Sequence, residues 1–160
     1  MAEKHQLNFY VFLCNPRADA LIQSLPNVFK LKGVEDLTEI DIALTKAFRS
    51  LGSSAVKPKR TCIQIVSDAL LQHHAVITRK WLGALLSDLR SKGFTTLAVV
   101  NPQMHPVEEV QAILGLFEGE IRISEKETAK GTKKVLKVRK LYNQRYLETE
   151  LILTKERLEA

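Results

Sequence analysis

Long apolar runs alternate along this chain with segments in which apolar residues recur every three or four positions. Three runs are almost continuously apolar, as is typical of strands buried on both faces of a parallel sheet: residues 7–14, 60–66 and 95–100. A fourth run, residues 28–32, alternates apolar and polar side chains, which predicts a half-buried strand. The chain therefore starts as a series of strands separated by longer connections.

A long helix is predicted after the second strand. Asp36 and Glu39 form a capping-box pattern, and Gly52 is placed to end the helix. Between them runs an apolar stripe: Leu37, Ile40, Leu44, Ala47, Phe48 and Leu51. Residues 18–25 are predicted to form a shorter helix between the first two strands.

Two further helices follow. Thr78 is expected to cap a second long helix with Trp81 on its inner face, ending at Lys92-Gly93. Pro106 suits the first turn of a third helix, whose predicted inner face is Val107, Val110, Ile113, Leu114 and Phe117. Residues 68–75 fit either a short helix or an irregular segment.

The last third of the chain returns to strand patterns. Residues 120–127 and 133–141 are predicted to pair as an antiparallel hairpin around Lys130-Gly131, with a further strand over residues 146–154. The earlier alternation of strands and helices predicts parallel strands joined by right-handed crossovers. The expected fold class is therefore α/β, with a mainly parallel sheet and a C-terminal antiparallel β-meander.

Length and composition favour one domain over residues 1–160, with residues 1–6 and 155–160 as flexible tails. No apolar run reaches the roughly 20 residues that span a bilayer, and the N-terminal run is too short for a signal peptide. Cys14 and Cys62 both fall in predicted buried strands, which indicates reduced thiols in a cytoplasmic protein, although neighbouring strands would permit a bridge. No metal site is expected.

The net charge of +6 is concentrated in one segment. Residues 126–140 contain seven basic residues and a single acidic one, Glu127. One interpretation is a solvated hairpin whose lysines prevent edge-to-edge pairing. The alternative is a surface for acidic protein, phosphate or nucleic acid, in which aromatic residues interleave with basic ones. Its candidate contacts are Lys137, Arg139, Lys140, Arg145, Tyr142 and Tyr146.

A short polar loop follows the predicted strand over residues 95–100, at a position where α/β proteins bind ligands. Asn101, Gln103 and His105 supply polar side chains there, so the loop is a candidate site for a small ligand. The alternative is a turn in which His105 caps the next helix.

Four segments carry a family resemblance: IQIVSDALL at Ile63–Leu71, TRKWLGALLSDLRSKGFTTLAVV at Thr78–Val100, EEVQAILGLFEGEI at Glu108–Ile121 and VLKVRKLYNQRY at Val135–Tyr146. In order and spacing they resemble the KaiC-like branch of the RecA ATPases. The resemblance runs from about Leu7 to Thr154 and implies a RecA-like three-layer core. It also implies that the chain starts one strand later than the family, whose phosphate loop follows that first strand.

The residues that carry the family's chemistry are replaced. No G-x-x-x-x-G-K-[ST] phosphate loop occurs in the sequence. The resemblance places the metal-binding carboxylate of the Walker B strand at Gln64, with Ser67 and Asp68 following, Asp68 in an expected loop. Leu13, Cys14 and Asn15 fill the places of the catalytic carboxylates. Phosphoryl transfer needs a phosphate cradle, a metal and a group that orients water, so we expect no catalysis and no ATP or Mg²⁺ cofactor.

One family contact has a partial counterpart. The family uses a lysine and an arginine of the meander to touch the ATP of a neighbouring subunit; Lys140 matches the lysine, and Tyr142 stands at the arginine position. Lys140 is either a relic of that contact or a residue that solvates a strand end. Strand alternation predicts two faces, one with Leu136, Val138 and Lys140 and the other with Lys137 and Arg139.

Three functions remain open. We favour a non-catalytic RecA/KaiC-like domain that acts by protein–protein contact, as a self-assembling or regulatory module, because the phosphate loop and both sets of carboxylates are replaced. The second is a nucleic-acid-binding module that uses the basic segment 126–146. The third is a fragment of an ATPase whose phosphate loop is supplied elsewhere. No membrane partner is expected, and a sheet without the family's first strand would need residues 1–6 or another subunit to cover it.

Overall fold

The structure is a computed structural model that describes residues 9–14, 27–51, 58–128 and 131–154. The chain forms two compact units, residues 1–112 and 113–160. The predictions for residues 1–6, 18–25 and 155–160, and those for Asn15 and Lys130, lie outside the described residues. Within the part of the chain that is described, no helix is long and apolar enough to cross a membrane.

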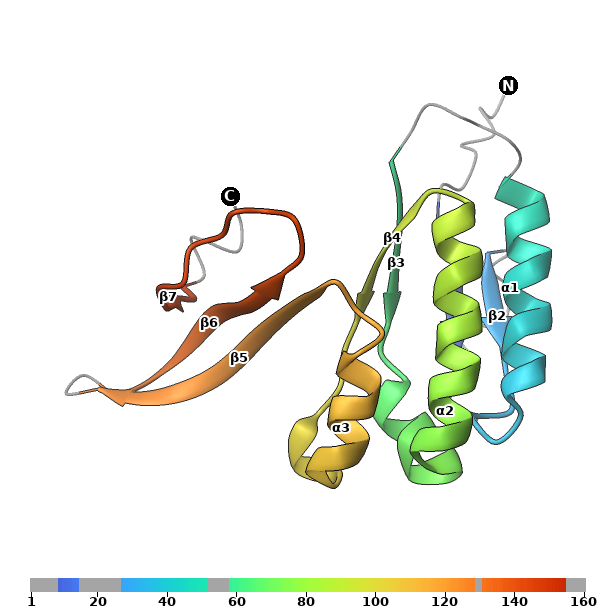
Figure 1. The fold of residues 1–160 in the computed structure, drawn as a ribbon. Coiled ribbons are helices and arrows are strands. Elements are labelled where there is room, and N and C mark those ends of the chain that lie inside the picture. The colour runs from blue at the N-terminus through green and yellow to red at the C-terminus, as the bar shows by residue number, and fades with distance from the viewer. Residues whose placement is uncertain (1–8, 15–26, 52–57, 129–130, 155–160) are drawn as a thin grey trace. The chain divides into compact units, whose positions relative to one another are not determined.

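The first unit alternates strands with helices, and its strands pair in parallel, β1 with β2 and β3 with β4. Both long helices, α1 and α2, run beside these strands (Figure 1). The expected α/β class is confirmed. The elements are, in chain order, β1 (Val11–Leu13), β2 (Val28–Lys30), α1 (Leu37–Leu51), β3 (Lys59–Ile63), α2 (Val66–Ser91), β4 (Phe94–Ala98), the 3₁₀ helix η2 (Pro102–Met104) and α3 (Val107–Leu114).

Helix α1 begins where its cap is predicted. The Asp36 carboxylate accepts hydrogen bonds from Thr38 N at 2.9 Å and from Glu39 N at 3.2 Å, which satisfies two backbone donors that a helix start leaves free. The other half of the capping box differs, because Glu39 Oε2 accepts from Lys32 N at 3.1 Å. Glu39 thereby ties the first turn of α1 to the segment that follows β2. The buried side chains of the helix are Ile40, Ala43 and Ala47.

Helix α2 starts well before Thr78, its predicted cap. Residues 68–75 are helical, and Asp68 lies in the first helical turn rather than in a loop. The helix is kinked at His74, whose backbone is non-helical with φ 58° and ψ 174°. The buried hydroxyl of Thr78 donates to Ala69 O at 3.0 Å, across the kink. The break at His74 separates a short helical stretch, one of the two interpretations predicted for residues 68–75, from a second, long helical stretch. The role of Thr78 differs from the prediction, because its hydroxyl donates to Ala69 O and does not cap the second stretch.

Among the described residues, side chains of the β3–β4 sheet are covered mainly on one face. The apolar runs predicted strands buried on both faces, but the side chains alternate along each strand. The covered face is the one toward the helices, since the ring of Phe94 lies 5.4 Å from that of Phe48 on α1. On the other face Cys62 is exposed beside Leu97, so the prediction of a buried Cys62 is wrong. The composition of an apolar run does not show whether its second face is covered by the same chain, by another molecule or by neither. The sequence therefore could not predict the exposure of Cys62.

Helix α3 is shorter than predicted, ending at Leu114. Val110 and Ile113 are buried as expected, whereas Val107 is exposed. Phe117 lies beyond the helix. The first turn of α3 therefore presents an apolar side chain to solvent, which the stripe alone does not reveal.

The second unit contains a three-stranded antiparallel sheet in the order β5-β6-β7, which confirms the C-terminal meander. Its strands are β5 (Gly119–Thr128), β6 (Gly131–Leu141) and β7 (Leu151–Ile152), the last much shorter than predicted. Residues opposite each other share a face of the sheet. One face carries the apolar side chains of Ile121, Ile123, Leu136, Val138 and Leu151, and farther along the hairpin Glu125, Glu127 and Lys134. The other carries Arg122, Ser124, Lys126, Lys133, Val135, Lys137 and Ile152, together with Glu120 and Lys140.

A β-bulge interrupts β6 at Arg139. Glu120 lies opposite Lys140 and Ile121 opposite Val138, so Arg139 has no residue opposite it. Lys140 consequently lies on the same face as Lys137 and not with Val138. The predicted distribution of these lysines between the two faces is wrong, because the extra residue shifts the two-residue period of the strand.

Candidate functional site

The carboxyl ends of β3 and β4 bring two predicted regions together. Ser67 lies in the first turn of α2, just after β3, and Asn101 follows β4. Ser67 Oγ accepts a hydrogen bond from Asn101 N at 2.8 Å. The segment that resembles a Walker B region and the candidate ligand loop, which the sequence suggested separately, are therefore joined by a direct hydrogen bond. Parallel strands place such loops at one edge of a sheet.

The donor groups at this edge are not those of a magnesium site. Gln64 follows β3 directly, is exposed, and makes no side-chain hydrogen bond with a described residue. Asp68 is exposed in the first turn of α2, where the helix dipole favours a carboxylate. Magnesium sites depend on carboxylates in near-ideal octahedral geometry. One exposed carboxylate, one neutral amide and the hydrogen-bonded Ser67 hydroxyl do not fit the metal of a bound nucleotide.

Cys14 follows β1 at one of the positions where the resemblance implies a catalytic carboxylate. Burial raises the pKa of its thiol, and the negative charges of Glu39 and Asp68 raise that pKa further. A thiol with a raised pKa stays protonated at neutral pH and is a poor nucleophile. Among the residues that the structure describes, no three His, Cys, Asp or Glu side chains gather as a metal-binding group.

The loop after β4 is a compact turn. Asn101 Oδ1 accepts from Gln103 N at 3.1 Å and so caps η2, while the side chain of Gln103 is exposed. His105 is buried, and its Nε2 has no hydrogen-bond partner among the described residues. The ring therefore does not cap α3, whose first backbone bond runs from Val110 N to Pro106 O at 3.2 Å. The sequence alone did not reveal this unsatisfied imidazole nitrogen.

The predicted basic contacts lie in the second unit. Lys137 and Lys140 share one face of the sheet, Arg139 occupies the bulge, and Arg145 is exposed in the segment after β6. Lys140 Nζ donates to Phe117 O at 2.8 Å, which holds the segment just before β5. Tyr146 Oη donates to Arg139 O at 3.3 Å. Lys140 thus has a structural hydrogen bond within its own chain.

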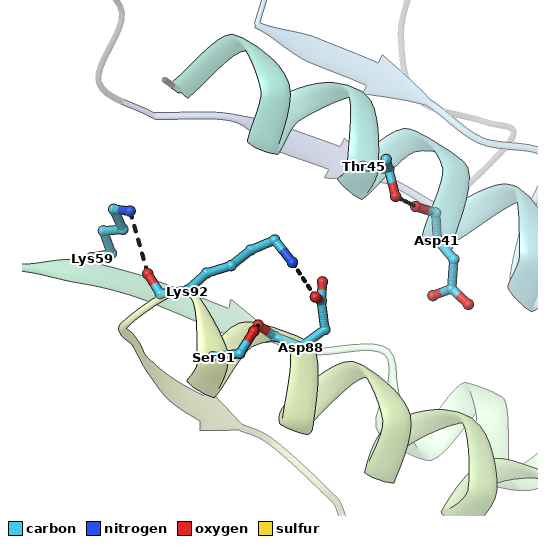
Figure 2. A network of polar contacts seen from close by, with 6 residues as sticks. All are labelled: Asp41, Thr45, Lys59, Asp88, Ser91 and Lys92. Carbon is cyan, nitrogen blue, oxygen red and sulfur yellow. Dashed lines mark hydrogen bonds and ion pairs between the residues drawn. The ribbon is translucent and has the colours of Figure 1, made fainter. Parts of the chain in front are cut away.

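A groove between α1 and α2 was not predicted. Its lining is Asp41, Leu44, Thr45, Phe48, Ala84, Leu85 and Asp88. Figure 2 shows Asp88 paired with Lys92, and Lys59 Nζ donating to Lys92 O at 3.3 Å. Burial raises the pKa of Asp41, the hydrogen bond from Trp81 Nε1 at 3.0 Å opposes this, and the charge of Asp88 adds to it. The sequence did not predict that Asp41 and Asp88 lie in one groove, because they belong to separate helices that only the packing brings together.

Comparisons with known proteins support the fold. No protein-family model matches the chain, and no curated protein matches it. Among solved structures it is similar to a KaiC-like protein from the hyperthermophilic archaeon Pyrococcus horikoshii OT3, with a TM-score of 0.56 and 18% sequence identity. The match covers 79% of this chain and 57% of that protein's chain. At this identity the likeness concerns the fold alone, and the chain has a KaiC-like, RecA-type α/β fold.

Proposed function

We propose that this chain is a non-catalytic RecA/KaiC-like domain that acts by protein–protein contact, as a self-assembling or regulatory module. The observation that carries the proposal is the exposed face of the β3–β4 sheet. Leu97 is 55% exposed and Val99 48% exposed, and Cys62 lies beside Leu97 on this face. Apolar side chains that gather on one exposed surface mark interaction sites far more often than scattered ones do.

The surroundings of this face fit a contact surface. Polar residues lie at both ends of this face. Arg60 is paired with Thr95 at one end, and Gln64 lies at the other end. An apolar centre with a polar rim is the usual anatomy of a protein interface. A second copy of this chain is the simplest partner, because a two-fold contact needs only one surface that is complementary to itself.

The chemistry at the carboxyl edge supports a role without catalysis. Gln64 supplies no charge for a metal ion, and Cys14 remains a protonated thiol. The Ser67 hydroxyl is used to hold the loop at Asn101. The hydrogen bond of Ser67 holds the segments after β3 and β4 together, which a scaffold needs and which does not require a bound nucleotide.

The first test is a thermal-shift titration with Mg-ATP, with Mg-ADP and without nucleotide, at a concentration where light scattering reports the mass. We expect a melting temperature indifferent to nucleotide, on a dimer or larger assembly. Ligand that binds only the folded state stabilises it by about 2.7 kcal/mol at one hundred times its Kd. A clear rise with Mg-ATP would contradict the proposal and favour an ATPase completed by another segment.

A variant pair locates the contact. Leu97→Glu places a charge at the centre of the proposed surface, and we expect it to reduce the measured mass to that of a monomer. Ile42→Glu is the matched control, because Ile42 is 53% exposed but lies on α1. Equal loss of assembly in both variants would mean that the β3–β4 face is not the contact.

A further inference from the structure

The sheet of the second unit places like charges directly opposite each other. Arg122 lies opposite Lys137, and Lys126 lies opposite Lys133, all on the face that also holds Val135. Like charges in opposite positions destabilise an antiparallel pair, whereas opposite charges stabilise it. Two such pairs on one face therefore carry a cost in stability that the fold alone does not explain.

Protection of a sheet edge explains only part of this arrangement. β6 lies between β5 and β7 (Figure 1), but β7 pairs only with Val135 and Leu136, so Lys133 and Lys137 flank the stretch that β7 covers. Charged side chains along such an edge prevent pairing with another chain. Edge protection does not require cations directly opposite each other on two strands, so the opposed pairs need a further explanation.

Internal ion pairs neutralise only part of this charge. Lys126 Nζ pairs with Glu150 Oε2 at 2.9 Å, and Arg122 with Glu120 Oε1 at 3.4 Å. The hydrogen bond and charge of Lys126 lower the pKa of Glu150, with a smaller contribution from the charge of Lys137. Among the described residues, neither Lys133 nor Lys137 forms an ion pair of its own. An excess of positive charge therefore remains on the face.

We propose that this surface, the basic face formed by Arg122, Lys126, Lys133 and Lys137, binds single-stranded nucleic acid through its phosphates. An aromatic side chain stands close in sequence to the strand that carries two of these lysines: Tyr142 directly follows β6 and is 65% exposed. Basic grooves or sheets with exposed aromatic rings bind single strands by phosphate contact and base stacking. This surface is separate from the proposed protein contact on β3–β4, so each proposal stands or fails by itself.

A single strand fits these features better than an acidic protein or a duplex does. An exposed tyrosine ring offers a stacking platform for an unpaired base, which neither a carboxylate side chain nor a paired base can use in the same way. The alternation along the strands spreads the cations over one face, where the side chains of Arg122 and Lys126 are exposed and Lys133 and Lys137 are half-buried beside the buried Val135. Several phosphates of one flexible strand can contact such a surface together.

The test is fluorescence anisotropy of the full chain with a labelled single-stranded deoxythymidine oligonucleotide, at salt concentrations from about 50 to 200 mM. We expect binding that weakens steeply with salt. Lys133→Gln/Lys137→Gln should weaken binding about tenfold and make the slope of log K against log salt shallower by roughly 0.7 for each phosphate that the variant no longer neutralises. Tyr142→Ala should weaken binding about fivefold or more with the salt slope unchanged.

The matched control is Lys46→Gln/Arg49→Gln, which removes the same charge from exposed positions on α1. It should bind like the unchanged protein, and equal loss in both double variants would reduce the effect to net charge and overturn the proposal. Tighter binding to a duplex of the same sequence, or binding only to a polyglutamate competitor, would overturn it in favour of those partners. The lysine variant should melt at or above the original temperature; if it unfolds, Arg122→Gln provides the same test.

Discussion

Among the described residues, the β3–β4 sheet and the β5–β6–β7 sheet each have a face of distinct chemistry. The first has the exposed side chains of Leu97 and Cys62, and the second has Lys133 and Lys137, half-buried beside the buried Val135 and directly opposite other cations. Exposed apolar surface has a free-energy cost that falls when a partner excludes water from it. Repulsion between like charges on opposite residues has a cost that falls when an anion binds between them. The sequence pattern of the strands does not show which side chains share a face. The register of the strand pairs does show it. Substitutions on each face, and at the packed positions behind it, test this contrast.

The largest expected difference in the free energy of unfolding is between a substitution in the packed core of the first unit and one on the exposed face of the β3–β4 sheet. Leu89 is 1% exposed and Leu97 is 55% exposed. We expect Leu89→Ala to lower the free energy of unfolding by about 2–5 kcal/mol, because it leaves a cavity in a packed core. Leu97→Ala should cost no more than about 0.5 kcal/mol in the monomer. Urea unfolding at low protein concentration measures both, and a similar loss in the two variants would mean that the β3–β4 face is already covered.

The next effect concerns the kink in α2. Thr78→Val keeps the shape of the side chain but leaves Ala69 O without the hydroxyl that donates to it at 3.0 Å. A buried carbonyl that loses its partner costs about 1–3 kcal/mol, so the variant should unfold at correspondingly lower urea. Thr78→Ser retains the hydroxyl and loses only a methyl group. The hydrogen bond would be unimportant if the serine variant were less stable than the valine variant.

A smaller effect of opposite sign is expected in the second unit. Lys137→Gln removes one member of the like-charge pair with Arg122 and should raise stability by roughly 0.2–1 kcal/mol. High salt should shrink the gain, because ions screen the repulsion between exposed charges. Lys46→Gln on α1 is the control for net charge. A loss of stability in Lys137→Gln, measured by the same urea titration, would show that the pairing is not repulsive.

The smallest effect is a pH dependence at the α1–α2 groove. Burial raises the pKa of Asp41 in the folded protein, so the folded state binds a proton more readily than the unfolded chain. The stability that this carboxyl contributes is therefore present at low pH and is lost as pH rises through the folded pKa. Asp41→Asn keeps an acceptor for Trp81 and should abolish that loss, gaining less than about 1 kcal/mol at neutral pH because water screens the exposed charge. Urea unfolding at acidic and neutral pH would contradict this if the two proteins showed the same pH dependence.

Local signals predicted those elements whose causes are local. The Asp36 cap and the apolar stripe located α1 because each residue acts within one or two helical turns. The hairpin of β5 and β6 followed from two strand patterns around a glycine. Within α2 the break was predicted slightly too late in the chain, because His74 leaves the helical conformation without a proline or glycine to mark it. A kink of this kind is stabilised by tertiary contacts such as Thr78 with Ala69.

The sequence placed the candidate residues Ser67 and Asn101 near strand ends, but it did not show that they contact each other. Ser67 and Asn101 are far apart in the chain, and only the parallel pairing of β3 with β4 brings them into contact. The burial of His105 could not be predicted from its neighbours in sequence, because the apolar ones, Met104 and Val107, are themselves exposed. Exposure of Cys62 was missed for a different reason, since its strand is apolar in composition whether or not something covers it.

The bulge at Arg139 gives one position of the chain an influence beyond its own side chain. The extra residue shifts the two-residue alternation of β6. Each side chain after it therefore points to the face opposite to the one that uninterrupted alternation would give. Deletion of Arg139 would join Val138 directly to Lys140 and make the strand regular, with Lys140 still on the face of Lys137. In an alignment with a chain that lacks the bulge, a gap placed away from Arg139 would assign the residues between the gap and the bulge to the wrong face of the sheet.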